Sequence, residues 1–321
     1  MNVFVHTSVM QKELVDALDL KPGGLAIDCT SGAGGHTKLL LDKVKENGRI
    51  FALDRDPAAI SFLTSSLKEK YSNLEIIMAP FSKIKAIAEE FGITKCIDGI
   101  CADIGVSSPQ LDNPERGFSF EKDGPLDMRM DPQNNEMTAY KVINEYSEDE
   151  LTRIFKEFGE EPKSRFAARK IVAERKKSPI NSTFRLSEII KESIYYKTGS
   201  KKHPATKIFQ AIRIYVNQEL NELEKLIKDG FEILSPGGRL AIISFHSLED
   251  RIIKNTFNKL GGKNSSLQLL RHVPLTHEEE MKHNQVQGKI IKPFPMLPSE
   301  DEIKANPRSR SAKLRIIEKT R

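Results

Sequence analysis

The sequence of 321 residues contains no tryptophan and only three cysteines, at positions 29, 96 and 101. An odd number of cysteines without metal-ligand spacing argues against a disulfide framework and is typical of reduced thiols. The seven histidines form no H-x-x-x-H pair, so we expect no metal site. No apolar run approaches the roughly 20 residues that span a bilayer, and the first residues lack the pattern of a signal peptide. These absences predict a cytoplasmic protein.

No strong excess of either charge is present. Charged residues make up 30% of the sequence and hydrophobic residues 38%, as in soluble globular proteins. The net charge of +5 is compatible with a polyanionic partner, although many proteins without one share it. Basic residues gather in 163–177 and 308–321. Two interpretations stay open for these stretches: solvated faces, or contacts with nucleic-acid phosphates.

Three apolar segments each end in an aspartate. The first ends at Asp28 and runs into a loop with glycines at 32, 34 and 35; the others end at Asp54 and Asp103. Glycines allow a ligand to approach the main chain, and a carboxylate after the second strand can hold two ribose hydroxyls. We therefore expect a nucleoside site at the carboxyl ends of a parallel sheet.

The glycine loop discriminates between cofactors. A dinucleotide fingerprint requires G-x-G-x-x-G, but here Gly32 and Gly34 are followed by Thr37. With Asp28 ahead of it, the loop is closer to D-x-x-x-G-x-G. That pattern suits a cofactor without pyrophosphate, whose amino-acid end lies against the loop. S-adenosylmethionine fits this description better than NAD.

Strand and helix patterns alternate as far as about residue 112 and again after about 205, which predicts a doubly wound, Rossmann-like α/β fold. The part between them is polar and mostly helical by pattern. We expect a methyltransferase domain, 1–112 and 206–321, interrupted by a helical insertion over 113–205 that recognises the substrate. Asp56-Pro57 and Ser147 through Glu150 predict helix starts, and 235–238 a turn.

The residues after the Asp103 strand are candidates for catalysis. Ser107, Ser108 and Pro109 lie where amino-group methyltransferases carry a short polar, proline-containing motif. An exocyclic amine on a base is a poor nucleophile because its lone pair is spread into the ring. Hydrogen-bond acceptors around its N–H groups can direct that lone pair at the methyl group, so the enzyme contributes chiefly orientation. The alternative is an ordinary Ser-Pro turn.

Four other residues each have two interpretations. Cys101 could be a thiolate nucleophile, but its place inside a strand favours a small buried hydrophobe. His36 either faces the ligand or is a solvated residue at a helix start. Phe81 is placed to stack on an adenine or to belong to the core. His246 either lines the acceptor pocket or is structural.

The sequence also resembles a known family, the bacterial small-subunit ribosomal RNA cytosine-N4 methyltransferases (the MraW or RsmH family). The resemblance spans almost the whole chain. It is carried by His6 to Met10, Asp28 to Thr37, Ala52 to Pro57, Asp103 to Asp112, Glu115 to Phe120, Gly124 to Met130, His203 to Ala211, Ser244 to Arg251 and Asn306 to Arg315. One departure is the loop Gly-Ala-Gly-Gly-His-Thr, where the family often has Gly-Arg-Gly-Gly-His-Ser.

The resemblance implies S-adenosylmethionine as the cofactor and methylation of the N4 amine of a cytidine in the decoding region of 16S ribosomal RNA. It implies cofactor contacts at Gly34, Gly35, His36, Asp54, Phe81, Asp103 and Gln110. Our candidate catalytic residues are Asp103, Ser107, Ser108 and Pro109. The expected partners are small-subunit ribosomal RNA or the 30S particle and no membrane, with a homodimer left open. The alternatives are a DNA amino-methyltransferase, an NAD-dependent oxidoreductase and a non-catalytic RNA-binding factor.

Overall fold

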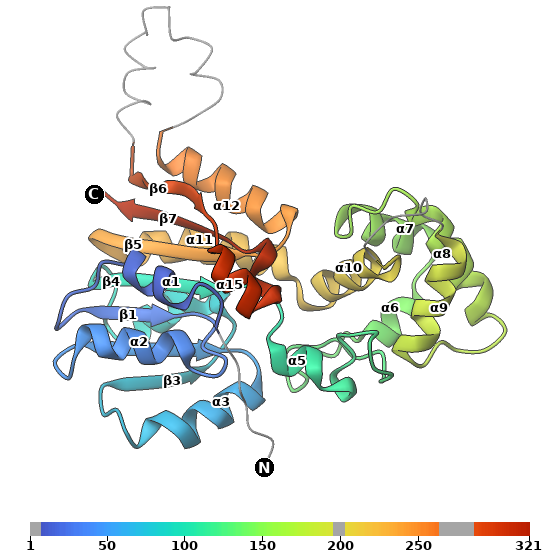
Figure 1. Ribbon diagram of the computed structural model, residues 1–321, viewed down its shortest axis with the longest axis horizontal. Coiled ribbons are helices and arrows are strands. Elements are labelled where there is room, and N and C mark those ends of the chain that lie inside the picture. The colour runs from blue at the N-terminus through green and yellow to red at the C-terminus, as the bar shows by residue number, and fades with distance from the viewer. Residues whose placement is uncertain (1–7, 195–202, 263–285) are drawn as a thin grey trace, which may run out of the picture. The chain divides into compact units, whose positions relative to one another are not determined.

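The computed structural model describes residues 8–194, 203–262 and 286–321. The chain divides into two compact units, which are described separately (Figure 1). The first comprises Met1–Gly105 and Leu220–Arg321, and the second Val106–Glu219. The helical unit thus takes in residues 106–112 and 206–219, which the sequence pattern assigns to the methyltransferase domain. The reason is packing, because Ile208, Phe209 and Ile212 belong to the core of the helical unit.

The first unit contains a seven-stranded sheet in the order β3-β2-β1-β4-β5-β7-β6. Strands β1 to β5 are parallel to their neighbours, whereas β7 runs antiparallel to β5 and β6. The strand order reverses between β1 and β4, which is where open α/β sheets bind ligands. The strands are β1 (Leu25–Asp28), β2 (Arg49–Asp54), β3 (Leu74–Met78), β4 (Ile97–Asp103), β5 (Leu234–Ser244), β6 (Gly288–Met296) and β7 (Lys313–Lys319).

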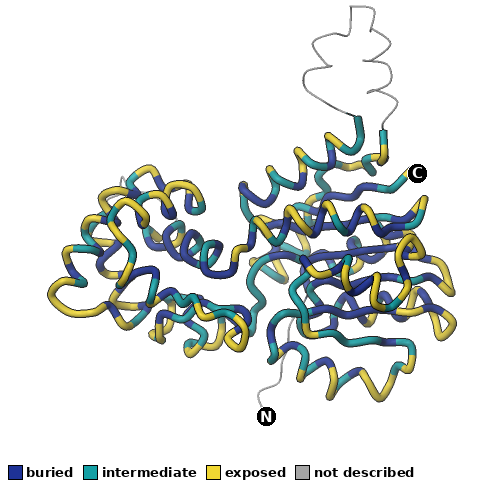
Figure 2. The backbone as a smooth tube through the Cα atoms, turned by 180° about the vertical axis from the view of Figure 1, so that it is seen from behind, coloured by how far each residue is buried: buried dark blue, intermediate teal, exposed yellow. Residues whose placement is uncertain are grey.

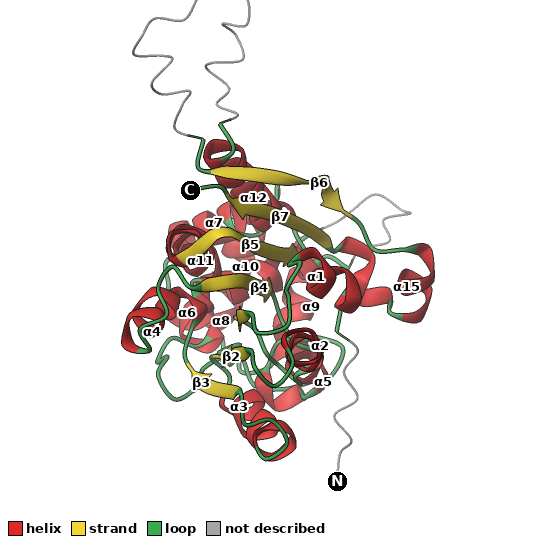
Figure 3. Cartoon of the chain, turned by 90° about the vertical axis from the view of Figure 1, so that its left-hand side faces the viewer, coloured by secondary structure: helices red, strands yellow, loops and turns green. Residues whose placement is uncertain are grey.

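Helices cover both faces of this sheet (Figure 3). One face carries α1 (Gln11–Ala17), α2 (Gly35–Val44) and α3 (Pro57–Leu63), and the other α4 (Ile84–Glu90), α11 (Glu219–Ile233) and α12 (Ser247–Leu260). The shorter elements are η1 (Thr64–Lys68), η2 (Phe81–Lys83), α15 (Glu300–Ala305) and η4 (Pro307–Ser311). The expected doubly wound α/β architecture is confirmed.

The strands are apolar on both sides because both sides are covered. Successive residues alternate between the two cores: Ile27 and Phe51 point to the α4 side, and Ala26 and Ile50 to the α1 side. All four are fully buried, and the tube in Figure 2 is dark blue along the central strands. Burying one large apolar side chain contributes roughly 1.5–3 kcal/mol, so this double-sided core holds the strand ends in place.

Local signals in the sequence agree with the structure at several points. The Asp56 carboxylate accepts a hydrogen bond from the Ala58 N–H at the start of α3. Two expectations need correction. The stretch 204–234 is not one helix, because Gln218 adopts the left-handed conformation between two helices. Residues 235–238 belong to β5, where the pairing register shifts relative to β4.

The second unit is helical. Its core is formed by apolar side chains of α6 to α10 and of the loop before α6. Ser147 and Glu150 form the predicted capping box at the start of α7. The elements are α5 (Ser108–Asp112), η3 (Pro114–Arg116), α6 (Ala139–Glu145), α7 (Glu148–Glu157), α8 (Ser164–Arg175), α9 (Thr183–Ser193) and α10 (Ala205–Asn217).

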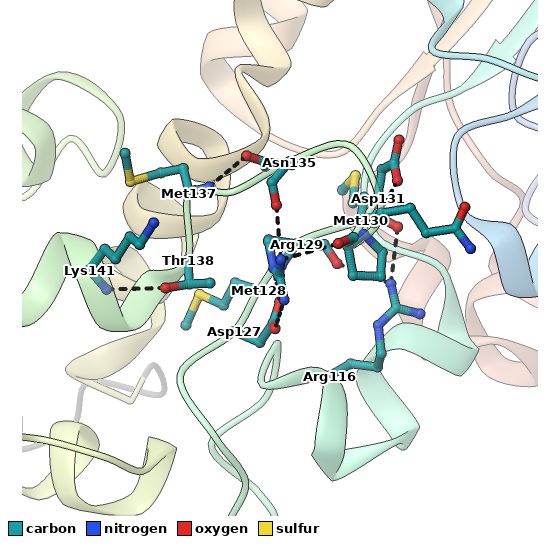
Figure 4. A network of polar contacts seen from close by, with 12 residues as sticks. Arg116, Asp127, Met128, Arg129, Met130, Asp131, Asn135, Met137, Thr138 and Lys141 are labelled. Atoms are coloured by element: carbon teal, nitrogen blue, oxygen red, sulfur yellow. Dashed lines mark hydrogen bonds and ion pairs between the residues drawn. The ribbon is translucent and has the colours of Figure 1, made fainter.

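A polar network holds the loop between η3 and α6 (Figure 4). The Arg129 guanidinium donates to both carboxylate oxygens of Asp127, at 2.9 and 2.7 Å. The Arg116 guanidinium donates to the carbonyl oxygens of Arg129 and Met130. From α10, the buried Asn217 amide accepts from the Met130 N–H and donates to the Met128 carbonyl. The motif around residues 124–130 is therefore a rigid structural element of this unit.

Within the described residues, no helix is both long and apolar enough to cross a bilayer.

Candidate active site

The carboxyl ends of β1, β2 and β4 lie at one edge of the sheet and are joined by the loop after β1. The Ser31 hydroxyl donates to the Leu53 carbonyl at the end of β2, at 2.9 Å. The Asp103 N–H, at the end of β4, donates to the Thr30 hydroxyl at 2.7 Å. These bonds bring together the three acidic strand ends that the sequence predicts.

Two glycines of the loop leave little room for a side chain. Gly34 precedes α2 with φ of +76°, and a Cβ there would lie 2.8 Å from the Leu67 Cδ1 atom. At Gly35 a Cβ would lie 2.0 Å from the Ser8 hydroxyl oxygen. The loop is thus closely packed between η1 and the N-terminal segment. Its backbone leads directly into the first turn of α2, whose N–H groups favour an anion such as a carboxylate.

The Asp54 carboxylate supports the loop from β2. It accepts the Gly32 N–H at 2.8 Å on one oxygen and the Asp56 N–H at 2.9 Å on the other. Even so, burial raises the pKa of Asp54 to about 6, because the two hydrogen bonds do not offset the lost hydration. The side chain keeps lone pairs for further donors, as ribose binding requires.

Asp28 lies deeper and is only 1% exposed. Its carboxylate accepts from the Thr37 hydroxyl at 2.7 Å, which connects β1 to α2. Burial raises the pKa of Asp28. His36 is also buried, its Nε2 atom lies 3.1 Å from the Val9 carbonyl oxygen, and burial lowers its pKa. Its ring is therefore engaged with the N-terminal segment, so a ligand contact at His36 would use its main chain.

Asp103 is the carboxylate with the most unusual environment. Its Oδ1 atom is inaccessible to solvent and has no hydrogen-bond partner in the described structure. Burial raises the pKa of Asp103 well above its ordinary value, and the nearby charges of Asp28, Glu249 and Glu302 raise it further. An orphaned carboxylate oxygen of this kind is expected where a ligand supplies the missing donor or positive charge.

The site as a whole is electronegative. Among the described residues, no lysine or arginine forms a hydrogen bond or ion pair with Asp28, Asp54 or Asp103. Such a site favours a cationic ligand and disfavours a pyrophosphate. These acids, beside a helix start that can hold a carboxylate, fit S-adenosylmethionine, which carries a sulfonium, an ammonium and a carboxylate. They do not fit NAD.

Phe81 begins η2, just after β3. Its ring is partly buried against the core on the α4 side. The Ala79 N–H donates to the Asp54 carbonyl at 3.0 Å, so the chain leading to Phe81 starts beside the end of β2. The core interpretation of Phe81 is therefore correct for part of the ring, and the rest remains available for a stacked base.

Ser107, Ser108, Pro109 and Gln110 belong to the second unit. The Ser107 hydroxyl caps α5, and the Gln110 side chain accepts the Ser107 N–H at 3.0 Å. Gln110 is only 5% exposed. The expectation of an ordinary Ser-Pro loop is therefore wrong, because Ser107 caps α5 and Ser108 and Pro109 lie in its first turn. Their roles in catalysis and cofactor binding remain predictions.

His246, whose role the sequence leaves open, and the buried Glu249, which sequence reasoning passed over, form a capping box at the start of α12. His246 begins α12, where its Nδ1 atom accepts the Glu249 N–H while the Glu249 carboxylate accepts the His246 N–H. Glu249 is 2% exposed and also accepts from Phe245. The sequence does not predict this capping box, because a histidine takes the position that serine or threonine usually holds.

The basic C-terminal stretch is partly internal. Arg315 is 3% exposed, donates to the Asp250 carboxylate at 2.8 Å and lies 4.3 Å from the centre of the Phe294 ring. Lys313 pairs with the same carboxylate at 3.0 Å. The interpretation of Arg315 as a phosphate contact is therefore wrong, because the guanidinium is buried and paired.

The other basic stretch, 163–177, lies mostly on α8, and several of its cations pair with glutamates. The Glu174 carboxylate forms ion pairs with Lys170, Lys177 and Arg185. Hydrogen bonds from Lys177 and Lys170 lower the pKa of Glu174 to about 2. Glu174 is buried, whereas the cations around it are partly or largely exposed. Arg165 and Arg169 are 71% and 63% exposed and share the single carboxylate of Glu148.

Acids at three strand ends, a glycine loop and an open helix start define an α/β enzyme that holds a cationic nucleoside cofactor. A family model described as the MraW methylase family matches residues 3–320. The sequence is 46% identical over 317 residues to Ribosomal RNA small subunit methyltransferase H of Clostridioides difficile (strain 630), with 98% of this chain and 99% of the relative covered. The chain belongs to the MraW methylase family. It is a methyltransferase whose cofactor is S-adenosylmethionine.

Two solved structures are also similar to the chain. An rRNA methylase from Streptococcus thermophilus is 11% identical with a TM-score of 0.38, and 99% of this chain and 100% of that chain are covered. A SAM-dependent O-methyltransferase from Thermotoga maritima is 11% identical with a TM-score of 0.41, and 100% of this chain and 69% of that chain are covered. Similarity at these scores adds nothing to the family assignment.

Proposed function

We propose that the protein methylates the N4 amino group of a cytidine in 16S ribosomal RNA, within the decoding region. The observation that carries the proposal is the electronegative edge of the sheet, where Asp103 keeps an unpartnered oxygen. The name of the C. difficile relative supports small-subunit ribosomal RNA as the acceptor.

The proposed cofactor site is formed by residues at the carboxyl ends of β1, β2 and β3. The main chain of Gly34, Gly35 and His36 would hold the carboxylate of the cofactor at the start of α2. Asp54 would accept the ribose hydroxyls, and Phe81 would pack on the adenine. When bound, S-adenosylmethionine supplies the methyl group and the thioether leaving group.

The contribution of the protein to transfer is orientation. Asp103 is the last residue of β4, and only three residues separate it from Ser107 in the chain. The Oδ1 atom of Asp103 would accept one N–H of the incoming amine. Oxygen atoms of Ser107 and Ser108 and the main chain at Pro109 would align the second N–H, and Gln110 would hold this loop through Ser107. Fixing the amine in this way raises the rate through proximity and orientation, without a covalent intermediate.

The helical unit would recognise the RNA. Arg165 and Arg169 lie one turn apart on α8, and Phe166 between them is 64% exposed. Two arginines that share one glutamate keep a net positive charge for phosphates, and an exposed ring can stack on an unpaired base. The acceptor is therefore RNA with unstacked bases, either free or within the 30S particle.

The test supplies tritiated S-adenosylmethionine together with free 16S RNA, 30S particles or duplex DNA. Label in ribosomal RNA as N4-methylcytidine supports the proposal, and label only in DNA supports the alternative of a DNA amino-methyltransferase. The Asp103→Ala variant should fold, because Oδ1 makes no hydrogen bond, and should transfer no methyl group, because it lacks the oxygen that would accept the amine. Near-normal turnover of this variant would contradict the role of Asp103.

A further inference from the structure

Four residues at the N-terminal end of the described chain bridge two parts of the first unit. Ser8 to Gln11, which we call the N-terminal clasp, contact the glycine loop and the start of α2 on one side. On the other side they contact α15, near the C-terminus.

The first set of contacts fixes the loop. The Gln11 side-chain amide donates to the Gly35 carbonyl at 2.8 Å. The Val9 carbonyl oxygen lies 3.1 Å from His36 Nε2, and the Ser8 hydroxyl occupies the space beside Gly35. The clasp therefore contacts Gly35 and His36, the first two residues of α2, directly after Gly34. These are the residues whose main chain would hold the cofactor carboxylate.

The second contact fixes the clasp itself. Met10 is fully buried and adopts the left-handed conformation, with φ of 45°. Its N–H donates to the Glu302 carboxylate at 2.5 Å, across 292 positions of sequence. A buried N–H without an acceptor is costly, so Glu302 keeps Met10 in this conformation. Glu302 is in turn held in the first turn of α15, where its N–H is capped by the Ser299 hydroxyl.

We propose that Glu302 is a positioning residue for S-adenosylmethionine, acting through Met10 and the N-terminal clasp on the loop at Gly34 to His36. The inference rests on the proposed cofactor site. Glu302 makes no hydrogen bond to that loop itself; its effect passes through the main chain of the clasp. The carboxylate of Glu302 also adds negative charge near Asp103, so its hydrogen bond and its charge must be tested separately.

Two variants separate these effects. Glu302→Gln keeps an acceptor for the Met10 N–H but removes the charge, whereas Glu302→Ala removes both. Glu300→Ala is the matched control, because Glu300 lies in the same first turn of α15 and is exposed. S-adenosylmethionine affinity is measured by calorimetry, amide hydrogen exchange is followed over 34–38, and thermal melting reports folding.

Loss of one buried hydrogen bond should weaken cofactor binding about tenfold in Glu302→Ala relative to Glu302→Gln. Exchange over 34–38 should accelerate in Glu302→Ala alone, and the Ala variant should combine non-additively with Gln11→Ala. Equal affinity and exchange in Glu302→Ala and Glu300→Ala would overturn the inference. If Glu302→Ala behaves like Glu300→Ala but the wild-type protein methylates ribosomal RNA, the proposed function stands and only the role of Glu302 is wrong. If wild type binds no cofactor, the proposed function fails, while hydrogen exchange still decides whether the clasp holds the loop.

Discussion

The raised pKa of Asp54 predicts that cofactor binding depends on pH. An aspartate has an ordinary pKa of 3.8, and burial raises that of Asp54 to about 6. A carboxylate must be ionised to accept two ribose hydroxyls fully. Below pH 6 the free protein holds a proton at Asp54 that binding must displace, so the cofactor should bind more weakly as the pH falls.

The magnitude follows from the ionised fraction. With a pKa of about 6, roughly nine-tenths of Asp54 is ionised at pH 7 and roughly one-tenth at pH 5, so the dissociation constant should rise about tenfold as the pH falls from 7 to 5.

The raised pKa of Asp54 also affects the stability of the fold. The folded state retains the proton between pH 3.8 and about 6 while the unfolded state loses it, so Asp54 lowers stability as the pH rises through this window. The loss reaches about 3 kcal/mol above pH 6.

Calorimetry with S-adenosylmethionine from pH 5 to 8 measures this dependence. Asp54→Asn is the control, because it removes the titrating group while a side-chain oxygen remains. Its binding should be weaker at every pH and should lack the change near pH 6. The pKa values of Asp28, His36 and Asp103 are also shifted, so any dependence that persists in Asp54→Asn belongs to these groups. Wild-type affinity that is constant between pH 5 and 7 would refute the reasoning.

Three further substitutions test other parts of the structure. Gly34→Ala should lower the free energy of unfolding by about 1–3 kcal/mol in urea denaturation, because φ is +76° and the new Cβ would crowd Leu67; an unchanged midpoint would contradict this. Asn217→Ala should cost about 1–3 kcal/mol by the same assay, since it leaves buried groups of Met128 and Met130 unpaired; stability equal to wild type would show that these two hydrogen bonds are dispensable. Cys101→Ala should retain methyl transfer, because burial raises the pKa of this thiol far from that of a nucleophile; complete loss of turnover in a folded variant would restore the thiolate mechanism.

The positions of the three acids were predictable because they depend on local patterns. An apolar run that ends in a carboxylate and is followed by helix signals indicates a parallel strand, and parallel strands end at a common edge. Asp28, Asp54 and Asp103 therefore come together without any knowledge of long-range contacts. Helix starts at Pro57 and Glu148 were predictable for the same reason, since capping depends on neighbouring residues.

What depends on long-range contacts was not predictable. Nothing near Glu302 in the sequence indicates that it accepts the Met10 N–H, and β6 carries prolines that weaken the strand pattern. The burial of Arg315 is another example, because its partner Asp250 lies 65 positions away and only the fold brings them together. From the sequence, both Arg315 and Arg169 are candidates for phosphate contacts. In the structure Arg315 is buried, whereas Arg169 is exposed.

The central claim is that the acidic strand ends hold S-adenosylmethionine so that its methyl group reaches the N4 amine of a ribosomal cytidine. The most direct measurement incubates wild type and Asp103→Ala with 16S RNA and S-adenosylmethionine carrying a deuterated methyl group, followed by mass spectrometry of the nucleosides. The account predicts deuterated N4-methylcytidine with wild type and none with the variant. Deuterium in a different nucleoside, or equal N4-methylcytidine from both proteins, would contradict it.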